Sequence, residues 1–223
     1  REIKAFKPER YFTITADTTT EKKVPLPLVC SEEPREQKEA ERILATGKKE
    51  AWHVAGVDET EVKRSPKAPF TTSTLQQTAS TRLGFSPSRT MRAAQKLYEA
   101  GHITYMRTDS TNMSKQAVEQ IAAMITKSFG KELVEPRVFT AKSKNAQEAH
   151  EAVRMTNATK RNAGANDDEK RLYGLIWART VASQMKDARM MRTKITANVA
   201  SKSIPDFQAN GSRTIYKGWL EAD

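Results

Sequence analysis

The chain contains very little cysteine: Cys30 is the one thiol among 223 residues. A single thiol excludes a disulfide framework and a cysteine-based zinc site within this chain. There is also no run of about 18 or more uncharged apolar residues, which excludes a transmembrane helix. The N-terminus lacks the pattern of a secretory signal peptide. We therefore expect a cytoplasmic protein with no membrane partner.

Apolar residues are scarce, at 37% of the chain, and aromatic residues make up 7%. Basic residues outnumber acidic ones by 38 to 27, for a net charge of +11. This excess is uneven, because the net charge is zero over residues 1–64, +9 over residues 65–190 and +2 over residues 191–223. A concentrated positive field attracts polyanions such as nucleic acids. An ordinary solvated surface can carry the same charge.

Strand-like sequence occurs near both ends of the chain. Residues 11–16 and 51–55 are rich in β-branched and aromatic side chains, and residues 193–199 alternate apolar with mostly polar ones. Asn210-Gly211 is the dipeptide most typical of a tight hairpin turn. A charged helix is expected over residues 33–46, between the two N-terminal strands.

The middle of the chain predicts helices, because capping residues and glycines recur at suitable spacing. The expected starts and ends are Ser73 to Leu83, Ser86-Pro87 to Gly101, Ser114 to Gly130, and a last start at Asn166 or Asp167. This order predicts an α+β multidomain chain. A β-rich domain is built from residues 1–64 and 191–223, and a mostly α-helical domain, residues 65–190, is inserted into it.

Tyr105-Met106-Arg107 is the first segment that could carry chemistry. If Ile103 to Arg107 is extended, Tyr105 and Arg107 project from one face. A tyrosine hydroxyl is a poor nucleophile unless positive charge stabilises its phenolate, and an arginine can supply that charge while gripping a phosphate. The same pattern fits an ordinary buried strand with a surface arginine.

His150 and Arg154 form the second such segment, since a helix would place them on one face. Together they could bind a phosphate, with the histidine as a proton donor. An exposed helix with ordinary neighbour contacts is the alternative. The zinc-protease pattern His-Glu-x-x-His is rejected, because Arg154 stands where the second histidine would be.

Two capped helices joined by Leu83-Gly84-Phe85 form a third feature, similar to a helix-turn-helix. The second helix is surrounded by basic side chains, which are Arg82, Arg89, Arg92 and Lys96. Many proteins that do not bind DNA contain such a pair, so by itself it has low specificity.

Taken together, these segments resemble the bacterial type IA DNA topoisomerases. The resemblance lies in five sequence motifs that occur in the same order as in the family. They are APFTTSTLQQ (68–77), ASTRLGF (79–85), LYEAG (97–101), ITYMRTDSTN (103–112) and QEAHEA (147–152). Weaker similarity continues from residues 172–177 to the C-terminus. Met106, between the tyrosine and the arginine, is similar to the topoisomerase I branch and unlike the topoisomerase III branch, which typically has proline there.

The resemblance implies that Tyr105 attacks a phosphodiester in single-stranded DNA and becomes linked to the 5′-phosphate. It implies that Arg107 positions the phosphate and that His150 contacts the scissile region. The other residues expected to contact DNA are Arg82, Arg89, Arg92, Thr108, Asp109 and Arg154. The implied fold is a β-rich arch that carries a helical catalytic-tyrosine domain with a catabolite-activator-like helix-turn-helix. The implied activity is relaxation of negatively supercoiled DNA by cleavage, strand passage and religation.

The family completes its cleavage centre with a Toprim domain, whose Glu and Asp-x-Asp-x-Glu motif bind Mg²⁺. This sequence has no such motif, and Asp167-Asp168-Glu169 has the spacing of a helix start instead. The chain also begins at Arg1 without an initiator methionine. We therefore expect a piece of a longer, monomeric polypeptide that supplies the Toprim and remaining domains. We expect no cofactor on this piece, Mg²⁺ in the full-length enzyme, and no activity from the piece alone.

Two other functions remain possible from the residues. Tyrosine recombinases also use Tyr, His and Arg on DNA, but their tyrosine follows an Arg…His-x-x-Arg framework, whereas Tyr105 precedes His150 here. The non-enzyme alternative is a helix-turn-helix module that binds DNA without cleaving it. Covalent trapping on DNA distinguishes an enzyme from such a module.

Overall fold

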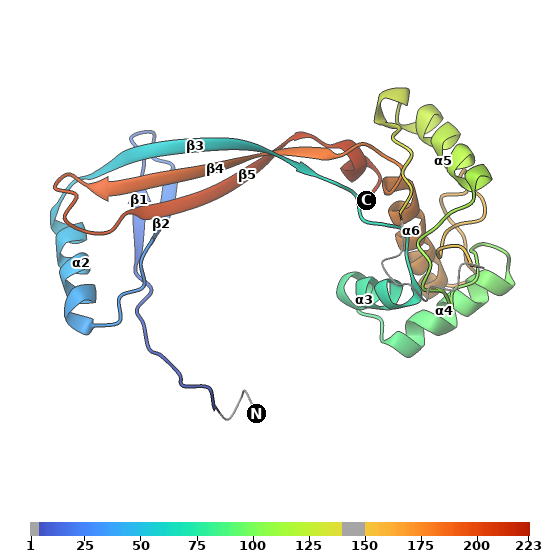
Figure 1. Ribbon diagram of the computed structural model, residues 1–223, viewed down its shortest axis with the longest axis horizontal. Coiled ribbons are helices and arrows are strands. Elements are labelled where there is room, and N and C mark those ends of the chain that lie inside the picture. The colour runs from blue at the N-terminus through green and yellow to red at the C-terminus, as the bar shows by residue number, and fades with distance from the viewer. Residues whose placement is uncertain (1–4, 140–149) are drawn as a thin grey trace. The chain divides into compact units, whose positions relative to one another are not determined.

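A computed structural model describes residues 5–139 and 150–223, which form two compact units (Figure 1). The β-rich unit comprises residues 5–62 and 190–213, and the helical unit comprises the described residues of 63–189 and 214–223. The chain passes between the units within three long strands, namely β3 (Trp52–Arg64), β4 (Ala188–Val199) and β5 (Phe207–Tyr216). The α+β class expected from the sequence is confirmed.

The β-rich unit is built on one sheet with strand order β1-β2-β5-β4-β3. Strand β1 (Thr15–Thr19) runs antiparallel to β2 (Pro25–Cys30), which in turn runs antiparallel to β5. Helix α2 (Gln37–Lys49) buries Ala40 and Ile43 as part of the unit's apolar core. The other core residues are Ile14, Leu28, Cys30, Ala197, Val199, Ile204 and Phe207.

Two strand predictions need correction. The first strand begins at Thr15 rather than at residue 11. The hairpin predicted at Asn210-Gly211 is wrong, because β5 continues through both residues. The turn between β4 and β5 lies earlier, around Lys202, which takes a positive φ of 52°. Asn198 stabilises this turn, since its amide donates to the Ile204 carbonyl at 3.0 Å and to the Asp206 carboxylate at 2.7 Å.

The helical unit contains α3 (Thr72–Leu83), α4 (Pro87–Glu99), α5 (Lys115–Ser128) and α6 (Asp167–Ala182). Helix α6 is buried on almost every side, as a helix at the centre of a unit must be. Its buried residues include Leu172, Leu175, Ile176 and Arg179, and also Tyr173, Trp177 and Val181. Helices α3 and α4 pack against α6 and against each other.

Three predicted helix starts are confirmed by their caps, whereas the helix expected over residues 33–46 runs from Gln37 to Lys49. Ser86, Ser114 and Asn166 each accept a hydrogen bond from the backbone N–H three residues on. The predicted cap at Ser73 is wrong, because Thr71 caps α3 and forms a capping box with Thr74.

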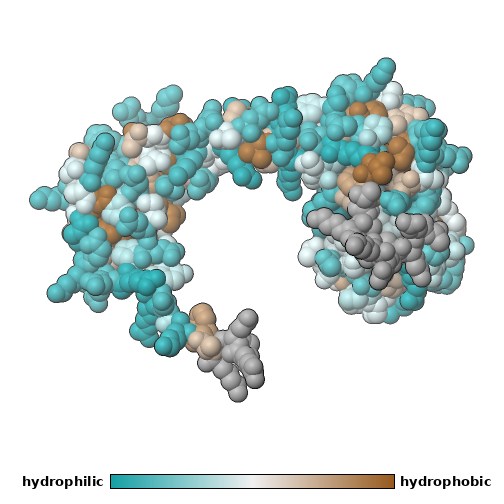
Figure 2. Space-filling model, viewed as in Figure 1, coloured by the Kyte–Doolittle hydropathy of each residue, from teal (hydrophilic) through white to brown (hydrophobic). Residues whose placement is uncertain are grey.

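Residues 214–223 belong to the helical unit, although the sequence groups them with the C-terminal strands. Trp219 explains this, because it is buried and its indole N–H donates to the Arg64 carbonyl at 2.7 Å. Its backbone N–H donates to the Lys186 carbonyl at 2.9 Å. The face shown in Figure 2 is mostly hydrophilic, with small scattered apolar areas. Over the described residues, no helix is both long enough and apolar enough to cross a membrane.

Gly218 begins the short 3₁₀ helix η2 (Gly218–Glu221) with a positive φ of 52°. A Cβ atom there would collide with the backbone carbonyls of Lys186 and Asp187. We expect Gly218→Ala to lower the free energy of unfolding by about 2 kcal/mol or more, since left-handed strain and overpacking add. Urea denaturation followed by far-ultraviolet circular dichroism measures this loss.

Gly211→Ala is the matched control, because a Cβ at Gly211 meets no atom within 4 Å. Its effect is expected to stay below about 0.5 kcal/mol, as for most exposed substitutions. Equal losses in the two variants would show that the contact around Gly218 is not tight.

Candidate active site

Tyr105 lies in an irregular segment that follows α4, after Gly101 turns the chain with a φ of 73°. Its side chain is 37% exposed. The Tyr105 ring contacts two other rings, those of Tyr98 on α4 and His150, with centroid distances of 5.3 and 5.5 Å. The structure therefore brings together two of the predicted catalytic residues, which are far apart in the sequence.

Ile103 to Arg107 do not form a regular strand, because Ile103 makes an isolated bridge with Met155 and the residues after it make none. Burial nevertheless alternates along the segment. Met106, Thr108 and Ser110 are buried, while Tyr105, Arg107 and Asp109 are exposed. Every second side chain thus remains accessible although no regular strand forms.

Thr72, in the first turn of α3, fixes this segment. Its hydroxyl donates to the Met106 carbonyl at 2.8 Å and accepts from the Thr108 N–H at 2.9 Å. Its backbone N–H donates to the Thr108 carbonyl at 2.8 Å. Because Thr108 is itself 8% exposed and its hydroxyl accepts from the Ser110 N–H, it supports the loop from inside.

The helix predicted across His150 and Arg154 is wrong for the described part, since residues 150–155 are extended; residues 147–149 lie outside the described residues. This segment is bonded on both sides. The Thr104 hydroxyl donates to the Ala152 carbonyl at 2.7 Å, and the Val153 N–H donates to the Phe70 carbonyl at 2.8 Å. These bonds, rather than a helix face, place His150 against Tyr105.

Arg154 points away from solvent, with its side chain 13% exposed. It donates to the Glu151 carboxylate and, at 2.9 Å, to the Met155 carbonyl. Burial alone would raise the pKa of Glu151, but hydrogen bonds from the Ser114 N–H and from Arg154 outweigh it and lower that pKa. The structure therefore gives Arg154 an internal ion pair and does not bring it to the surface with His150.

Arg107 and Asp109 are exposed, and neither side chain has a hydrogen bond or ion pair with another described residue. The Arg107 guanidinium consequently retains all its donors for an external partner. A planar guanidinium with free donors is suited to a phosphate oxygen pair.

The arginines around α4 differ in how they are engaged. Arg89 makes a two-pronged ion pair with Asp168, at 2.6 and 2.7 Å, and lies over the Phe85 ring. The Arg89 hydrogen bond lowers the pKa of Asp168. Arg82 pairs with Asp223. Arg92 is exposed and has no such bond within the described part of the chain.

The roles of Tyr98 and Thr72 are not apparent from the sequence. Tyr98 lies in the motif LYEAG and Thr72 in the motif APFTTSTLQQ. Nothing in their local spacing indicates that one contacts the Tyr105 ring and that the other anchors the backbone on either side of Arg107. A signal of that kind exists only in three dimensions.

No group of three or more His, Cys, Asp or Glu side chains that could hold a metal ion occurs among residues 5–139 and 150–223. Near Tyr105 the Glu151 carboxylate is already bonded to Ser114 and Arg154. The described residues therefore do not fit a Mg²⁺ site, and Asp167-Asp168-Glu169 forms the first turn of α6 as expected.

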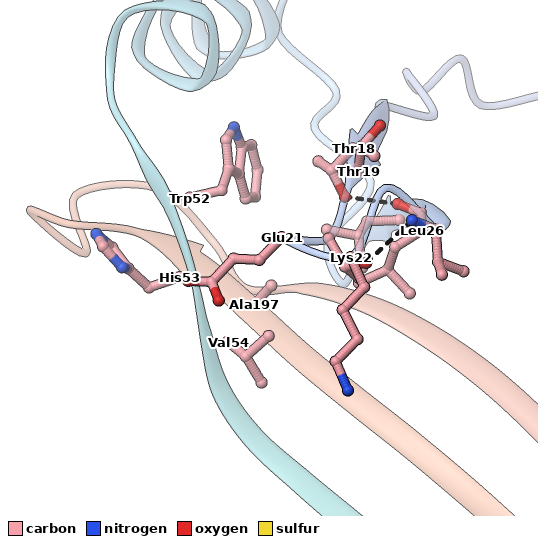
Figure 3. Close-up of a pocket in the computed structure, with 12 residues that line it drawn as sticks. Thr18, Thr19, Glu21, Lys22, Leu26, Trp52, His53, Val54 and Ala197 are labelled. Atoms are coloured by element: carbon pink, nitrogen blue, oxygen red, sulfur yellow. Dashed lines mark hydrogen bonds between the residues drawn. The ribbon is translucent and has the colours of Figure 1, made fainter.

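A hollow of about 720 Å³ lies in the β-rich unit. Figure 3 shows Glu21 extending from the β1–β2 turn toward β3, which contributes Trp52, His53 and Val54. The Thr18 hydroxyl donates to the Leu26 carbonyl at 2.6 Å across the β1–β2 pair. None of the residues predicted to act in catalysis or DNA binding lines this hollow.

The whole chain, residues 1–223, matches the family model described as DNA topoisomerase. The chain belongs to the bacterial type IA DNA topoisomerases. It is 41% identical to DNA topoisomerase 1 of Vibrio cholerae over 98% of this chain and 26% of that protein. It is 43% identical to DNA topoisomerase 1 of Synechococcus elongatus over 84% of this chain and 21% of that protein.

The fold agrees with this membership in the type IA topoisomerases. The structure of full-length topoisomerase I from Thermotoga maritima matches with a TM-score of 0.79 and 33% identity, over 99% of this chain and 37% of that chain. The chain spans about a quarter of the length of the Vibrio cholerae relative. The resemblance to the type IA topoisomerases that the sequence motifs indicate is confirmed.

The Glu151–Arg154 pair predicts a pH-dependent contribution to stability. Glu151→Gln leaves a mostly buried guanidinium without its carboxylate, so we expect the free energy of unfolding to fall by about 1–3 kcal/mol at neutral pH. Because the folded-state pKa of Glu151 is lowered, this contribution is present above its unfolded-state pKa and is lost as the pH falls through the folded-state value. Urea denaturation at a series of pH values should show the two proteins converging in acid.

Glu119→Gln is the control for this prediction, because Glu119 forms an exposed pair with Lys115 at 3.9 Å. Such a pair contributes roughly 0–1 kcal/mol. A Glu151→Gln loss no larger than this, or one that does not change with pH, would contradict the role given to the buried pair.

Proposed function

We propose that the chain carries the DNA-cleaving nucleophile of a type IA topoisomerase, and that this nucleophile is Tyr105. The observation that carries the proposal is the arrangement at Tyr105 itself. An accessible tyrosine lies on a loop fixed by Thr72, against the ring of His150 and two residues from an arginine that has no hydrogen bond or ion pair with the described residues. Membership of the DNA topoisomerase family supports a phosphodiester as the group attacked.

In the proposed reaction, the Tyr105 hydroxyl oxygen attacks the phosphorus of a single-stranded phosphodiester. A bond forms between that oxygen and the phosphorus, and the bond from phosphorus to the 3′-oxygen breaks. The tyrosyl hydroxyl loses its proton, and the departing 3′-oxygen gains one. The product is a 5′-phosphotyrosine with a free 3′-hydroxyl, and attack by that hydroxyl reverses the step. Strand passage between the two steps relaxes negative supercoils.

Arg107 has the role of orienting the phosphate and offsetting its charge with its free guanidinium. His150 has the role of contacting the scissile region, where a histidine can hold or move a proton. Tyr98 limits the motion of the Tyr105 ring by its edge contact, at a centroid distance of 5.3 Å.

Mg²⁺ is expected in the full-length enzyme, on a Toprim domain elsewhere in the same polypeptide, because the described residues do not form a site for it. We further propose that the β-rich unit is the family's arch and that α3 and α4 are its catabolite-activator-like helix-turn-helix. A monomer acting on single-stranded regions of DNA in the bacterial nucleoid completes the proposal.

A module that only binds DNA through α3 and α4 is the weaker candidate. Such a module needs several free cations on its helices, yet Arg82 and Arg89 are both engaged in ion pairs with carboxylates, and of the three arginines predicted to contact DNA here Arg92 alone has no such bond within the described residues. It also leaves the contacts around Tyr105 without a purpose.

The nucleophile can be tested by substitution in the longer protein that contains this chain. Tyr105→Phe removes only the hydroxyl, so DNA binding should persist while covalent protein–DNA adducts disappear. Arg107→Lys keeps the charge but loses the planar fork, and cleavage should fall about tenfold or more, equivalent to roughly 1.4 kcal/mol of transition-state stabilisation. His150→Ala should have a milder effect on cleavage, because the proposed role of His150 is to contact the scissile region and not to act as the nucleophile. Denaturing gels of labelled oligonucleotides measure all three.

Tyr98→Phe is the matched control, since it removes a neighbouring hydroxyl and retains the ring that contacts Tyr105. Adduct formation should continue in this variant. An adduct formed by Tyr105→Phe would mean that another residue is the nucleophile, and the proposed mechanism would be wrong.

The isolated chain should neither cleave nor relax supercoiled DNA, with or without Mg²⁺, because it lacks the metal-binding acids of the family. Agarose-gel relaxation assays on the purified chain test this. Relaxation that survives repeated purification but is abolished by Tyr105→Phe would show that the chain is sufficient by itself.

A further inference from the structure

A basic hollow of about 260 Å³ lies in the helical unit, away from the residues that contact Tyr105. It is bordered by the end of β3, by α3, by α6 and by η2. Its lining combines cationic groups with two hydroxyls and one carboxylate, from Arg64, Lys67, Arg82, Arg179, Thr78, Thr81 and Asp223. Four cations therefore face one acid.

Arg179 is the least expected member of this lining. Its side chain projects from α6, is only 9% exposed, and lies over the Phe70 ring at 4.3 Å. Its guanidinium has no hydrogen bond or ion pair with any residue that the structure describes. Burial lowers the pKa of Arg179, Asp223 partly offsets this, and Arg82 adds to it. An arginine nonetheless remains charged in a protein.

A buried charge without a partner is costly, so such a group ordinarily pairs with an ion of opposite sign. The carboxylate of the hollow does not fill this role, because Asp223 pairs with Arg82. The other two cations of the hollow, Arg64 and Lys67, add further positive charge and have no carboxylate partner among the described residues. Arg64 lies over the Trp219 ring at 5.3 Å, and Lys67 is exposed with no ion pair to the described residues.

We propose that this hollow binds one phosphate group of a DNA backbone, at a position separate from the phosphate that Tyr105 attacks. The proposal rests on the proposed function for its choice of DNA. The Arg179 fork faces a hollow with room for a phosphate, Lys67 adds a mobile positive charge at the rim, and the hydroxyl of Thr78 is an additional donor. No lining residue belongs to the group formed by Tyr98, Tyr105 and His150.

The decisive variant is Arg179→Met, which replaces the charge by an apolar side chain of similar length. Replacing a buried charge in this way is often neutral or stabilising, so the variant is expected to fold with an unchanged or higher melting temperature. Its affinity for a labelled single-stranded oligothymidylate at low salt should fall about tenfold, as measured by fluorescence anisotropy. The slope of log affinity against log salt should become shallower by roughly 0.7, the share of one single-stranded phosphate.

Lys67→Gln is a second variant that does not disturb the buried core, and a loss of about threefold with a shallower salt slope is expected. Lys127→Gln is the matched control, because Lys127 is an exposed cation in the last turn of α5 and does not line the hollow. It should bind DNA within about twofold of the unmodified protein. Equal losses in Lys127→Gln and Lys67→Gln would overturn the proposal in favour of a general effect of charge.

Affinity and salt slope unchanged in Arg179→Met would also overturn it. Inorganic phosphate tests whether the hollow binds a free phosphate ion instead of a phosphate of DNA. If it raises the melting temperature of the unmodified protein and not of Arg179→Met, while oligothymidylate binds both equally, the hollow takes free anions and the DNA assignment is wrong. Tyr105→Phe should keep full affinity and slope, so loss of the hollow and loss of the cleavage mechanism give different results. Absence of any DNA binding by the unmodified protein would contradict both.

Discussion

The hydroxyl of Thr72 lies between two peptide groups of the Tyr105 loop, and the geometry of the site depends on it. The first backbone N–H groups of a helix have no partner inside that helix, and an irregular buried loop has carbonyls with the same need. Here the helix start and the loop satisfy each other's hydrogen-bonding groups, because Thr72 at the start of α3 bonds to the backbone of Met106 and Thr108. Arg107 lies between these two anchored residues and Tyr105 lies next to Met106, so both are displayed on a rigid support without belonging to a regular element.

The charged side chains of the helical unit fall into paired and unpaired groups. Carboxylates in the helical unit pair with arginines that have structural tasks, as Asp168 does with Arg89 and Glu151 does with Arg154. Arg107, Arg92 and Arg179 have no such partner within the described residues. Part of the positive excess of the middle segment is therefore carried by arginines that have no carboxylate partner among the described residues and that differ in burial.

The sequence predicted best what is decided locally. Helix starts at Ser86, Ser114 and Asn166 follow from side chains that bond to the backbone three residues away, and such bonds need no tertiary contact. Strand pairing is decided between distant segments, so the hairpin expected at Asn210-Gly211 was overridden by the pairing of β5 within the sheet. For the same reason spacing alone could not show that His150 reaches Tyr105 on an extended segment. Neither the burial of Arg179 on α6 nor the hollow beside it follows from local spacing, since both are decided by the elements that pack around α6.

The order of the strands in the sheet has a consequence for how the chain folds during synthesis. β5 lies between β2 and β4, and β3 at the edge contacts only β4. Residues 15–64 therefore emerge from the ribosome well before residues 188–216, which supply the centre of their sheet. Such distant pairings are slow to form. The helices of the middle segment, rich in local contacts, are made before those last strands. The β-rich unit is thus completed only when the end of this chain has been translated, and until then its early strands expose unpaired edges that invite association with other chains.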